Sequence, residues 1–278
     1  MRVEERDGLL AYRFEGVAGE GLDCLVSTRG GGVSERPCTS LNVGFKVEDD
    51  GAAVLENRRR LLTAFGFELE RTVWGEQVHG DRVAVVRAED AGRGALDAGS
   101  AIAGVDALVT DVPGLALCAT VADCVPLVLF DPVVGALGVA HAGWSGTVAK
   151  IAARTAETMA ESFGSSPSNL LAAIGPSIGP DAYEVGGEVI ARVHDTFGAH
   201  AAELLTPLPG GKALLDLWRA NSLALIECGV QEARIEVAGI STAAHLDHFY
   251  SYRSEGLTGR FCVVAALSAV NLSKAYDQ

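Results

Sequence analysis

The sequence has no excess of positive charge. Acidic side chains number 36 against 22 basic ones, which gives a formal net charge of −14 at pH 7. A chain this acidic lacks the basic surface that nucleic-acid phosphates and anionic lipid headgroups require. We therefore expect neither nucleic acid nor a membrane as a partner, and no obligate protein partner is evident.

Neither an export signal nor a membrane-spanning run is expected from the residues of this sequence. The first ten residues, MRVEERDGLL, carry acids and arginines where a secretory signal needs an apolar core. The longest stretch without charge, residues 132–149, is interrupted by glycines and by His141. The six cysteines form no CxxC pair, and a chain this long does not depend on disulfides. These features predict a cytoplasmic protein with reduced thiols.

No internal repeat, low-complexity tract or linker divides the chain. With 278 residues, 49% of them hydrophobic, it has the composition of a folded globular protein. A chain of this length buries about three quarters of its surface on folding. We predict a single domain over residues 1–278.

Short apolar runs typical of strands alternate with stretches of helical periodicity. Several of the runs are apolar on both faces, which is typical of buried sheet. The expected strands are 24–28, 82–86, 107–110, 116–120, 127–130, 136–140, 171–174, 235–237 and 261–265. The expected helices are 52–65, which the acidic pair Asp49-Asp50 would open, 147–163, 189–197 and 215–228.

One arginine interrupts the apolar stripe of the first expected helix. Arg58 falls in the middle of the stripe that contains Val54, Leu61, Leu62 and Phe65. A guanidinium in that position must pair with a carboxylate, reach solvent through a cleft, or bind an anion. A paired or snorkelling arginine and an anion-binding arginine both stay open as interpretations.

Three separated segments each contain one metal-competent side chain. GEQVHGDR (75–82) contains His79, ATVADCVPLVLFDP (119–132) contains Cys124, and GVAHAGWSGT (138–147) contains His141. One thiolate and two imidazoles form the ligand set of an open zinc site, with a fourth position for water or substrate. Zinc lowers the pKa of bound water toward about 7 and polarises a substrate oxygen. Asp123, beside Cys124, would orient a ligand imidazole or move a proton.

A structural interpretation of the same residues is available. A cysteine at the end of an apolar strand is often part of the core, and each histidine can be hydrogen-bonded near a turn. The flanking glycines and the proline after Cys124 instead favour strand-to-loop junctions, where sites are usually built.

The order of several motifs makes the sequence similar to a known family. They are STRGGGVS (27–34), TSLNVGFKVEDD (39–50), ENRRRL (56–61), QVHG (77–80), ADC.P (122–126), GVAHAGWSGT (138–147), AIGPSIG..AYEVG (173–186), LDLWRAN (215–221) and FYSYRSEGLTGR (249–260). In this order they resemble the YfiH-type family. Its members are variously called laccase-domain polyphenol oxidases, the peptidoglycan editing factor PgeF, and purine nucleoside phosphorylases.

The resemblance implies a fold, a cofactor and an activity. The implied fold is α/β (α+β), a single domain with central mixed β-sheets covered by helices, of the kind grouped with cysteine hydrolases. His79, Cys124 and His141 match the three metal positions of the family, so zinc is the implied cofactor, with copper as the alternative. The implied activities are phosphorolysis of adenosine, inosine and methylthioadenosine, and deamination of adenosine.

Further residues take their roles from the same resemblance. Asn42, Arg58 and Arg253 match motif positions that we place around the substrate or phosphate, and Asp123 and Cys124 are the expected catalytic residues. The sequence departs from the family pattern at four positions, Val121, Ser177, Ser241 and Ala244. None of these is a proposed metal ligand, although Val121 removes a hydroxyl from the neighbourhood of Cys124.

Other functions stay open on the sequence. A metal-free thiol hydrolase would use Cys124 with a histidine to edit a cell-wall precursor. A copper-dependent polyphenol oxidase needs more histidine and methionine ligands than the sequence supplies for a full multicopper cluster. A non-enzymatic binding module is the third alternative. The zinc-deaminase signature, the P-loop and the dinucleotide fingerprint are all absent, and HLDH (245–248) is expected to be a surface loop.

Overall fold

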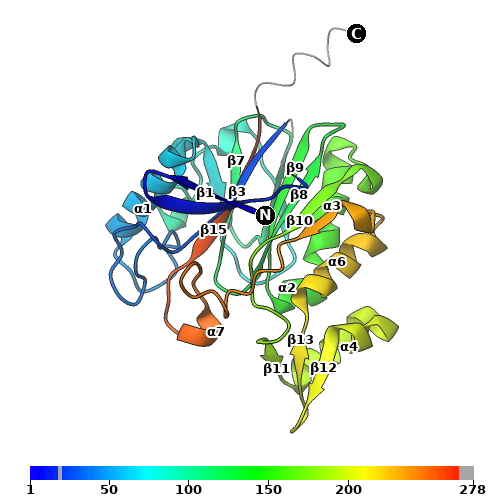
Figure 1. Ribbon diagram of the computed structural model, residues 1–278. Helices are drawn as coiled ribbons and strands as arrows, with labels where there is room; N and C mark the ends of the chain where they lie inside the picture. The colour runs from blue at the N-terminus through cyan, green and yellow to red at the C-terminus, as the bar shows by residue number, and fades with distance from the viewer. Residues whose placement is uncertain (18–20, 269–278) are drawn as a thin grey trace.

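Two mixed β-sheets packed face to face form the centre of the computed structural model, which describes residues 1–17 and 21–268 (Figure 1). The first sheet has the strand order β1-β2-β3-β15-β7-β4 and the second β14-β10-β8-β9-β6-β5. The first sheet has one parallel edge pair, β4 with β7, whereas both edge pairs of the second sheet, β5 with β6 and β10 with β14, are parallel. The remaining neighbours in both sheets are antiparallel.

The strand bounds of the first sheet are β1 Arg2–Arg6, β2 Leu9–Arg13, β3 Leu22–Ser27, β4 Thr72–Trp74, β7 Ala116–Val121 and β15 Phe261–Leu267. Those of the second are β5 Val83–Val85, β6 Ala107–Thr110, β8 Val125–Asp131, β9 Ala136–Ala142, β10 Leu171–Ile174 and β14 Ile235–Val237.

Both faces of these sheets are covered, which explains why their strands are apolar on both sides. Along β15, Phe261 and Val263 enter the core between the two sheets, whereas Cys262 and Val264 enter a second core on the outer face. The same alternation occurs along β8, where Val128 faces the first sheet and Leu127 faces the helices. The buried-sheet interpretation of the sequence is confirmed.

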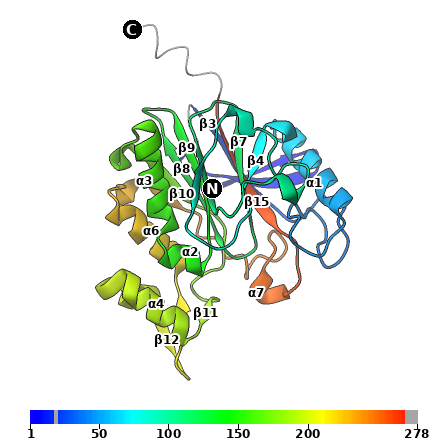
Figure 2. The same ribbon diagram turned by 180° about the vertical axis from the view of Figure 1, so that it is seen from behind.

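Helices cover the two outer faces (Figures 1 and 2). Leu61, Leu62 and Phe65 at the end of α1 pack against the first sheet, while α3 and α6 cover the second. The helix bounds are α1 Gly51–Ala64, α2 Trp144–Val148, α3 Ile151–Phe163, α4 Gly187–Phe197, α5 Ala201–Leu204, α6 Leu217–Glu227 and α7 Tyr252–Glu255. The expected α/β fold with mixed sheets and covering helices is therefore confirmed.

A third, antiparallel sheet projects from one end of the molecule together with α4 (Figures 1 and 2). It has the strand order β11-β13-β12, with bounds β11 Glu184–Val185, β12 Leu205–Leu208 and β13 Lys212–Leu215. The short strands of this sheet were not expected from the sequence, and neither were β1, β2 and β4. Edge strand β1 is mostly exposed and so lacks the apolar alternation that marks a buried strand.

One expected helix was wrong in detail. The stretch 147–163 is divided between α2 and α3 by Lys150, which adopts a left-handed conformation with φ of 59°. A residue in that region cannot continue a right-handed helix, although the apolar residues on both sides of it keep one helical period. The remaining expected helices and all the expected strands occur with shifts of a few residues at their ends.

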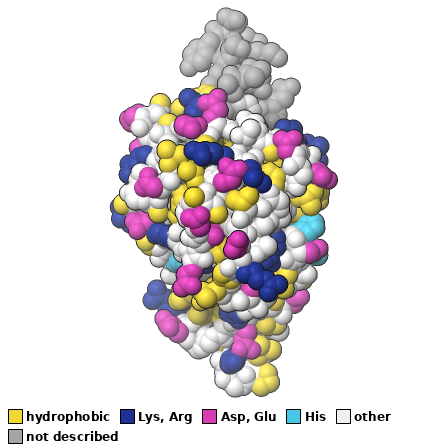
Figure 3. Space-filling model, turned by 90° about the vertical axis from the view of Figure 1, so that its left-hand side faces the viewer, with side chains coloured by type: hydrophobic (Ala, Val, Ile, Leu, Met, Phe, Trp, Pro, Cys, Tyr) yellow, Lys and Arg dark blue, Asp and Glu magenta, His cyan; other side chains and the backbone are white. Residues whose placement is uncertain are grey.

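The surface carries charge of both signs. Acidic and basic side chains alternate with small apolar patches over the face shown in Figure 3. Among the described residues, none of the helices has the length and apolar character needed to cross a bilayer.

The N-terminus of α1 provides a test of the helix prediction. The Asp50 side chain accepts a hydrogen bond from the backbone N–H of Ala52. Asp50→Ala removes this cap, and we expect a loss of about 1 kcal/mol in the free energy of unfolding measured with urea. Asp50→Asn keeps the cap and is the matched control. Equal stability of the two variants would contradict the capping role.

Candidate metal centre

The three ligand candidates of the sequence come together at one end of the two sheets. His79, Cys124 and His141 each offer one ligand atom, and these atoms all lie within 4.8 Å of one another. His79 is exposed, Cys124 is partly buried and His141 is buried. The two imidazole rings meet edge to face, with centroids 4.8 Å apart.

A buried carboxylate fixes both histidines. Asp106 Oδ1 lies 2.8 Å from His141 Nδ1, which leaves the Nε2 atom of His141 as the nitrogen that could bind a metal. The same carboxylate accepts backbone N–H groups from Val78, His79 and Gly80, at 3.1, 3.0 and 2.7 Å. Asp106 thus orients one ligand directly and holds the turn that carries the other. The carboxylate that contacts a ligand imidazole is therefore Asp106 and not Asp123.

Gln77 ties the same turn to β7. Its Nε2 donates to the carbonyl oxygen of Thr120, and its Oε1 accepts from the backbone N–H and hydroxyl of Thr120, all within 2.9 Å. The Gln77 side chain therefore bonds the edge of β7 as a neighbouring strand would. Two residues later, His79 has a φ of 61°, in a region that histidine tolerates better than most residues.

Cys124 lies in the short connection through which the chain passes from β7 in the first sheet to β8 in the second. The preceding Asp123 has a φ of 84°, an unfavourable value for a residue with a side chain. Its carboxylate is held at Oδ1 by the hydroxyl of Thr242 at 2.6 Å, and at Oδ2 by the backbone N–H of Arg253 at 2.7 Å. These contacts maintain the conformation that presents the sulfur to the two imidazoles.

The three side chains shift one another's ionisation. Burial raises the pKa of the Cys124 thiol, but His141 and His79 outweigh burial and lower that pKa to about 6. Burial lowers the pKa of His141, but Cys124 and Asp106 raise it to about 9. Asp106 is buried as well, yet its hydrogen bonds to His141 and the backbone lower its pKa. The shifts favour a thiolate on Cys124 beside a protonated His141, and the thiolate is the form that binds metals.

The donor set and the space around it fit a metal ion. Two nitrogens and one sulfur suit zinc, which accepts such sets in sites with an open position. A Cβ atom built on Gly143 would lie 3.0 Å from Cys124 Sγ and 3.1 Å from His79 Cδ2. Glycine at this position thus leaves room for the three ligand side chains to converge.

A cavity of about 640 Å³ opens in front of the ligands. All three ligands line it, with aromatic walls from Trp74, Trp144, Tyr183 and Tyr252. Its cationic lining residues are Lys46, Arg58, Arg253 and Arg260, and its carboxylates are Glu76 and Asp123. In a chain of net charge −14, this local excess of cationic side chains favours an anionic ligand.

Arg58 lies in the wall of this cavity. Its guanidinium lies over the rings of Trp74 and Phe45, at 3.7 and 4.3 Å from their centroids. Nε donates to the carbonyl oxygen of Val43, and Nη1 donates to those of Gly94 and Ala95, all within 2.9 Å. Burial lowers the pKa of Arg58 to about 10. The arginine is thus satisfied by carbonyls and aromatic rings, and no acidic partner pairs with it among the described residues.

The other two expected substrate residues occupy different environments. Arg253 lines the cavity, where its Nη1 donates to the carbonyl oxygen of Glu184 and its guanidinium lies over the ring of Tyr183. Asn42 is fully buried, and its amide bonds Asp49, Gly44 and the backbone N–H of Arg260. Asn42 therefore contacts a cavity residue instead of lining the cavity.

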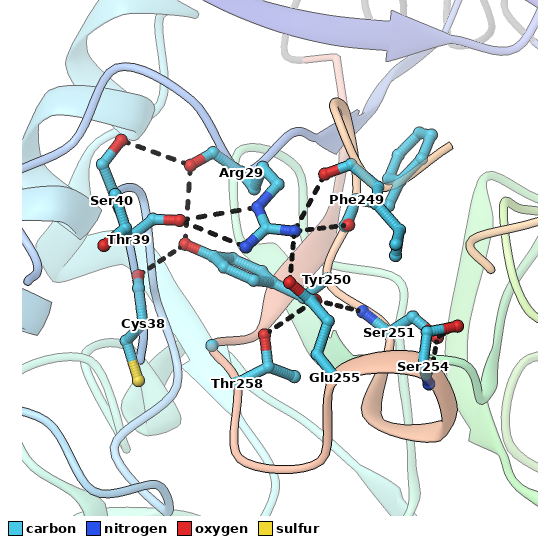
Figure 4. A network of polar contacts seen from close by, with 12 residues as sticks. Arg29, Cys38, Thr39, Ser40, Phe249, Tyr250, Ser251, Ser254, Glu255 and Thr258 are labelled. Atoms are coloured by element: carbon cyan, nitrogen blue, oxygen red, sulfur yellow. Dashed lines mark hydrogen bonds and ion pairs between the residues drawn. The ribbon is translucent and has the colours of Figure 1, made fainter. Parts of the chain in front are cut away.

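A polar network joins Arg29 to the segment around α7, the short helix that contains Tyr252 and Arg253 (Figure 4). Glu255 accepts from Arg29 at 2.9 Å, from the backbone N–H of Ser251 at 3.1 Å and from the hydroxyl of Thr258 at 3.0 Å. Arg29 also donates to the carbonyl oxygens of residues 246 and 249 and lies over the ring of Tyr250. Through this network Arg29 of STRGGG contacts the distant segment FYSYRSEG, which contributes Tyr252 and Arg253 to the cavity wall.

Sequence reasoning missed several residues of this site, above all Asp106, Gln77 and Arg260. Gln77 and Arg260 belong to motifs quoted for the family, so their positions were within reach. Asp106 precedes a short apolar strand, where a carboxylate is equally consistent with a simple loop residue. Of the four residues that depart from the family pattern, the two serines are accommodated by hydrogen bonds: Ser177 accepts from Trp218 and Ser241 accepts from the backbone of Gly179.

Comparison with known proteins assigns the chain to a family. The family model described as "Multi-copper polyphenol oxidoreductase laccase" matches residues 23–268. The chain belongs to this family. The expected membership of the YfiH-type, laccase-like family is therefore confirmed.

Several named relatives are similar to this chain over most of its length. "Purine nucleoside phosphorylase YlmD" of Geobacillus stearothermophilus is 39% identical over 84% of this chain and 86% of its own. "Adenosine deaminase RL5" of an unknown prokaryotic organism is 35% identical over 86% and 90%. The crystal structure of YlmD from Geobacillus stearothermophilus superposes with a TM-score of 0.91 at 37% identity, covering 95% of this chain and 98% of that one.

Asp106 provides a test of the metal centre. Asp106→Asn keeps one acceptor for His141 but replaces the oxygen that accepts from Val78 and Gly80 with a donor. We expect metal affinity, measured by chelator competition, to fall about 10- to 100-fold, as for other residues that orient metal ligands.

The matched control is Asp131→Asn, which changes a buried turn carboxylate at the other end of β8. An equal loss of affinity in both variants would assign the effect to general destabilisation.

Gly143 provides an independent steric test. Gly143→Ala places a methyl group against Cys124 and His79, so we expect a reduced metal stoichiometry by elemental analysis. Gly187→Ala is the control, because no heavy atom lies within 4 Å of the added methyl group there. Full metal occupancy in Gly143→Ala would contradict the close convergence of the three ligands.

Proposed function

We propose that this chain is a metal-dependent purine nucleoside phosphorylase that also deaminates adenosine, with zinc as the metal. The observation that carries the proposal is the His79, Cys124 and His141 triad facing a cavity with aromatic walls and cationic side chains. The names of the relatives, a phosphorylase and an adenosine deaminase, support the same substrates. Adenosine, inosine and methylthioadenosine are the proposed nucleosides.

The cavity offers matching chemistry for each part of the reactants. Its volume of about 640 Å³ lies within the usual range of small-molecule sites. The aromatic walls present flat apolar surfaces on which a purine can stack. The cationic residues suit phosphate, which carries negative charge at neutral pH.

In phosphorolysis, an oxygen of phosphate forms a bond to C1′ of the ribose while the bond between C1′ and the purine nitrogen breaks. The purine leaves with the bonding electrons and takes up a proton, and ribose 1-phosphate is the second product. In deamination, water forms a bond to C6 and ammonia leaves from the same carbon. A zinc ion held by the triad would supply Lewis acidity toward an oxygen of the reactants.

The chain's own residues have roles that follow from their contacts. His79, Cys124 and His141 are the proposed metal ligands, and Asp106 sets the orientation of His141. The expected catalytic role of Asp123 stays a prediction. Both of its oxygens already accept hydrogen bonds, which favours a role in positioning Cys124.

The expected binding residues divide in the same way. Arg253 presents its guanidinium at the cavity wall and is a proposed substrate contact. We assign Arg58 to the wall on which the substrate packs, and Asn42 to positioning of the residues beside it. Because the ligands come from turns and strands of both sheets, we also propose that residues 1–278 act as one domain.

A second function is favoured by one specific observation. The lowered pKa of Cys124 beside His141 is also the arrangement of a thiol nucleophile with its base. A hydrolase that edits a cell-wall precursor by this chemistry, on a fold of the cysteine-hydrolase kind, is therefore the alternative. The copper-dependent polyphenol oxidase named by the family model is the third.

The decisive experiment follows adenosine with and without phosphate. With the metal-loaded protein we expect adenine and ribose 1-phosphate only when phosphate is present, and inosine with ammonia when it is absent. Cys124→Ala should lose bound zinc and both activities together. Failure of the wild-type protein to form adenine, hypoxanthine or inosine at catalytic concentrations would remove the proposal.

The same preparation separates the alternatives. Stoichiometric zinc that is lost in Cys124→Ala counts against a metal-free thiol hydrolase. A thiolate-to-copper absorption band after copper loading, together with oxidation of a phenol, would instead favour the oxidase.

A further inference from the structure

Arg260 lies on the border between two cavities. It precedes β15 and lines the metal-facing cavity, and it also lines a neighbouring cavity of about 400 Å³. Lys46, Val47 and Tyr252 line both cavities as well. The partly buried guanidinium of Arg260 therefore stands where the two spaces adjoin.

One edge of the Arg260 guanidinium is used and the other is available. Nη1 donates to the carbonyl oxygens of Thr258 and Gly259, at 2.8 and 2.9 Å. Within residues 1–17 and 21–268, neither Nε nor Nη2 has a hydrogen-bond partner, and no carboxylate forms an ion pair with this arginine. Nε–H and Nη2–H point the same way, in the geometry that matches two oxygens of one phosphate or carboxylate.

The chain holds this arginine from behind. Its backbone N–H donates to Asn42 Oδ1 at 2.8 Å. The side-chain stem lies so close to Gly44 that an added Cβ there would be 2.8 Å from Arg260 Cβ and Cγ. Glycine at position 44 thus leaves space for the stem, and Asn42 fixes its start. Such support favours a fixed binding group over a surface arginine.

The other cationic residues of the cavity differ from Arg260 in their contacts or in their exposure. Lys46 lies 3.4 Å from Glu76. Arg253 donates to a backbone carbonyl of β11 and lies over Tyr183. Arg58 uses Nε for the carbonyl of Val43, which blocks the edge that a phosphate would bind with two hydrogen bonds. Arg253 also keeps its Nε and Nη2 edge free among the described residues, but it is exposed. Arg260 combines a free Nε and Nη2 edge with partial burial.

Charge and burial favour an anion at this position. A partly buried guanidinium without a carboxylate partner carries a desolvation cost that a bound anion offsets. Burial lowers the pKa of Arg260, against the opposing effects of Cys124, Cys38 and Asp123. Cys124 and Asp123 lie at the candidate metal centre. Arg260 therefore lines the same cavity as that centre.

We propose that Arg260 binds the inorganic phosphate co-substrate through Nε and Nη2, at the border of the two cavities. This inference rests on the proposed phosphorylase function, in which phosphate must lie beside the ribose within the metal-facing cavity. Arg260 is thereby the residue that distinguishes phosphorolysis, which needs phosphate, from deamination, which needs only water.

The test compares Arg260→Met and Arg260→Lys with Arg59→Met. Arg59 is an exposed arginine on α1, next in sequence to Arg58, and serves as the matched control. We expect Arg260→Met to raise the KM for phosphate in inosine phosphorolysis by about 10- to 100-fold, since a charged hydrogen-bonding pair is lost. The KM for inosine, the zinc content and the rate of adenosine deamination in phosphate-free buffer should stay within about threefold of the wild type.

Arg260→Lys keeps the charge without the paired donors, so its phosphate KM should lie between those of the wild type and Arg260→Met. If Arg260→Met does not fold, the phosphate KM of Arg260→Lys alone tests the role of Arg260. An unchanged phosphate KM in the folded variants, or an equal loss of deamination and phosphorolysis, would overturn the role of Arg260.

Calorimetric titration with inorganic phosphate tests phosphate binding by Arg260 independently of whether the protein is a phosphorylase. If the wild-type protein forms no base from nucleosides, the phosphorylase proposal fails, and phosphate binding still tests the site. Binding to the wild type that is lost in Arg260→Met supports the anion site. Absence of binding to the wild type, or equal binding to both proteins, overturns it.

Discussion

The rest of the site depends on the hydrogen bonds of one buried carboxylate, that of Asp106. It accepts three backbone N–H groups from the turn at residues 78–80, and it contacts the inner nitrogen of His141. One side chain thereby fixes the relative position of two candidate ligands, His79 and His141, that come from different segments. Because all of its contacts are made inside the fold, the carboxylate is desolvated and yet has its hydrogen-bonding capacity filled. Its environment favours the charged form, which is what a neighbouring imidazole ligand needs.

The fold brings these groups together because the chain changes sheets beside them. Cys124 follows β7 of the first sheet and precedes β8 of the second, and His141 lies on β9, the neighbour of β8. The cores on both sides of each sheet fix the two sheets relative to each other. The left-handed conformation of Asp123 is maintained by contacts from Thr242 and Arg253, which belong to a later part of the chain. Ligand geometry is therefore a property of the whole sandwich.

The sequence predicts the central strands well because they are buried on both sides and carry continuous apolar runs. It fails for β1, whose residues are mostly exposed, and for the break at Lys150, where a single backbone conformation ends a helix without changing the apolar period. At the site, the sequence indicated His79, Cys124 and His141 because each is a metal-competent side chain close to glycine or proline residues. Arg58 was recognisable as an anomaly on a helical wheel, but its carbonyl partners come from loops that carry no periodic signal. Asp106 is defined only by tertiary contacts, which no local pattern records.

The place of Cys124 between the sheets also has a thermodynamic consequence. A metal ion held by His79, Cys124 and His141 would join segments that lie near one another only in the native chain, so the native state would bind it and the unfolded state would not. Above saturation, each tenfold rise in free metal then adds about 1.4 kcal/mol to the native state. Supply of the metal would thus govern how much of the chain persists in the cell as well as how much of it is active.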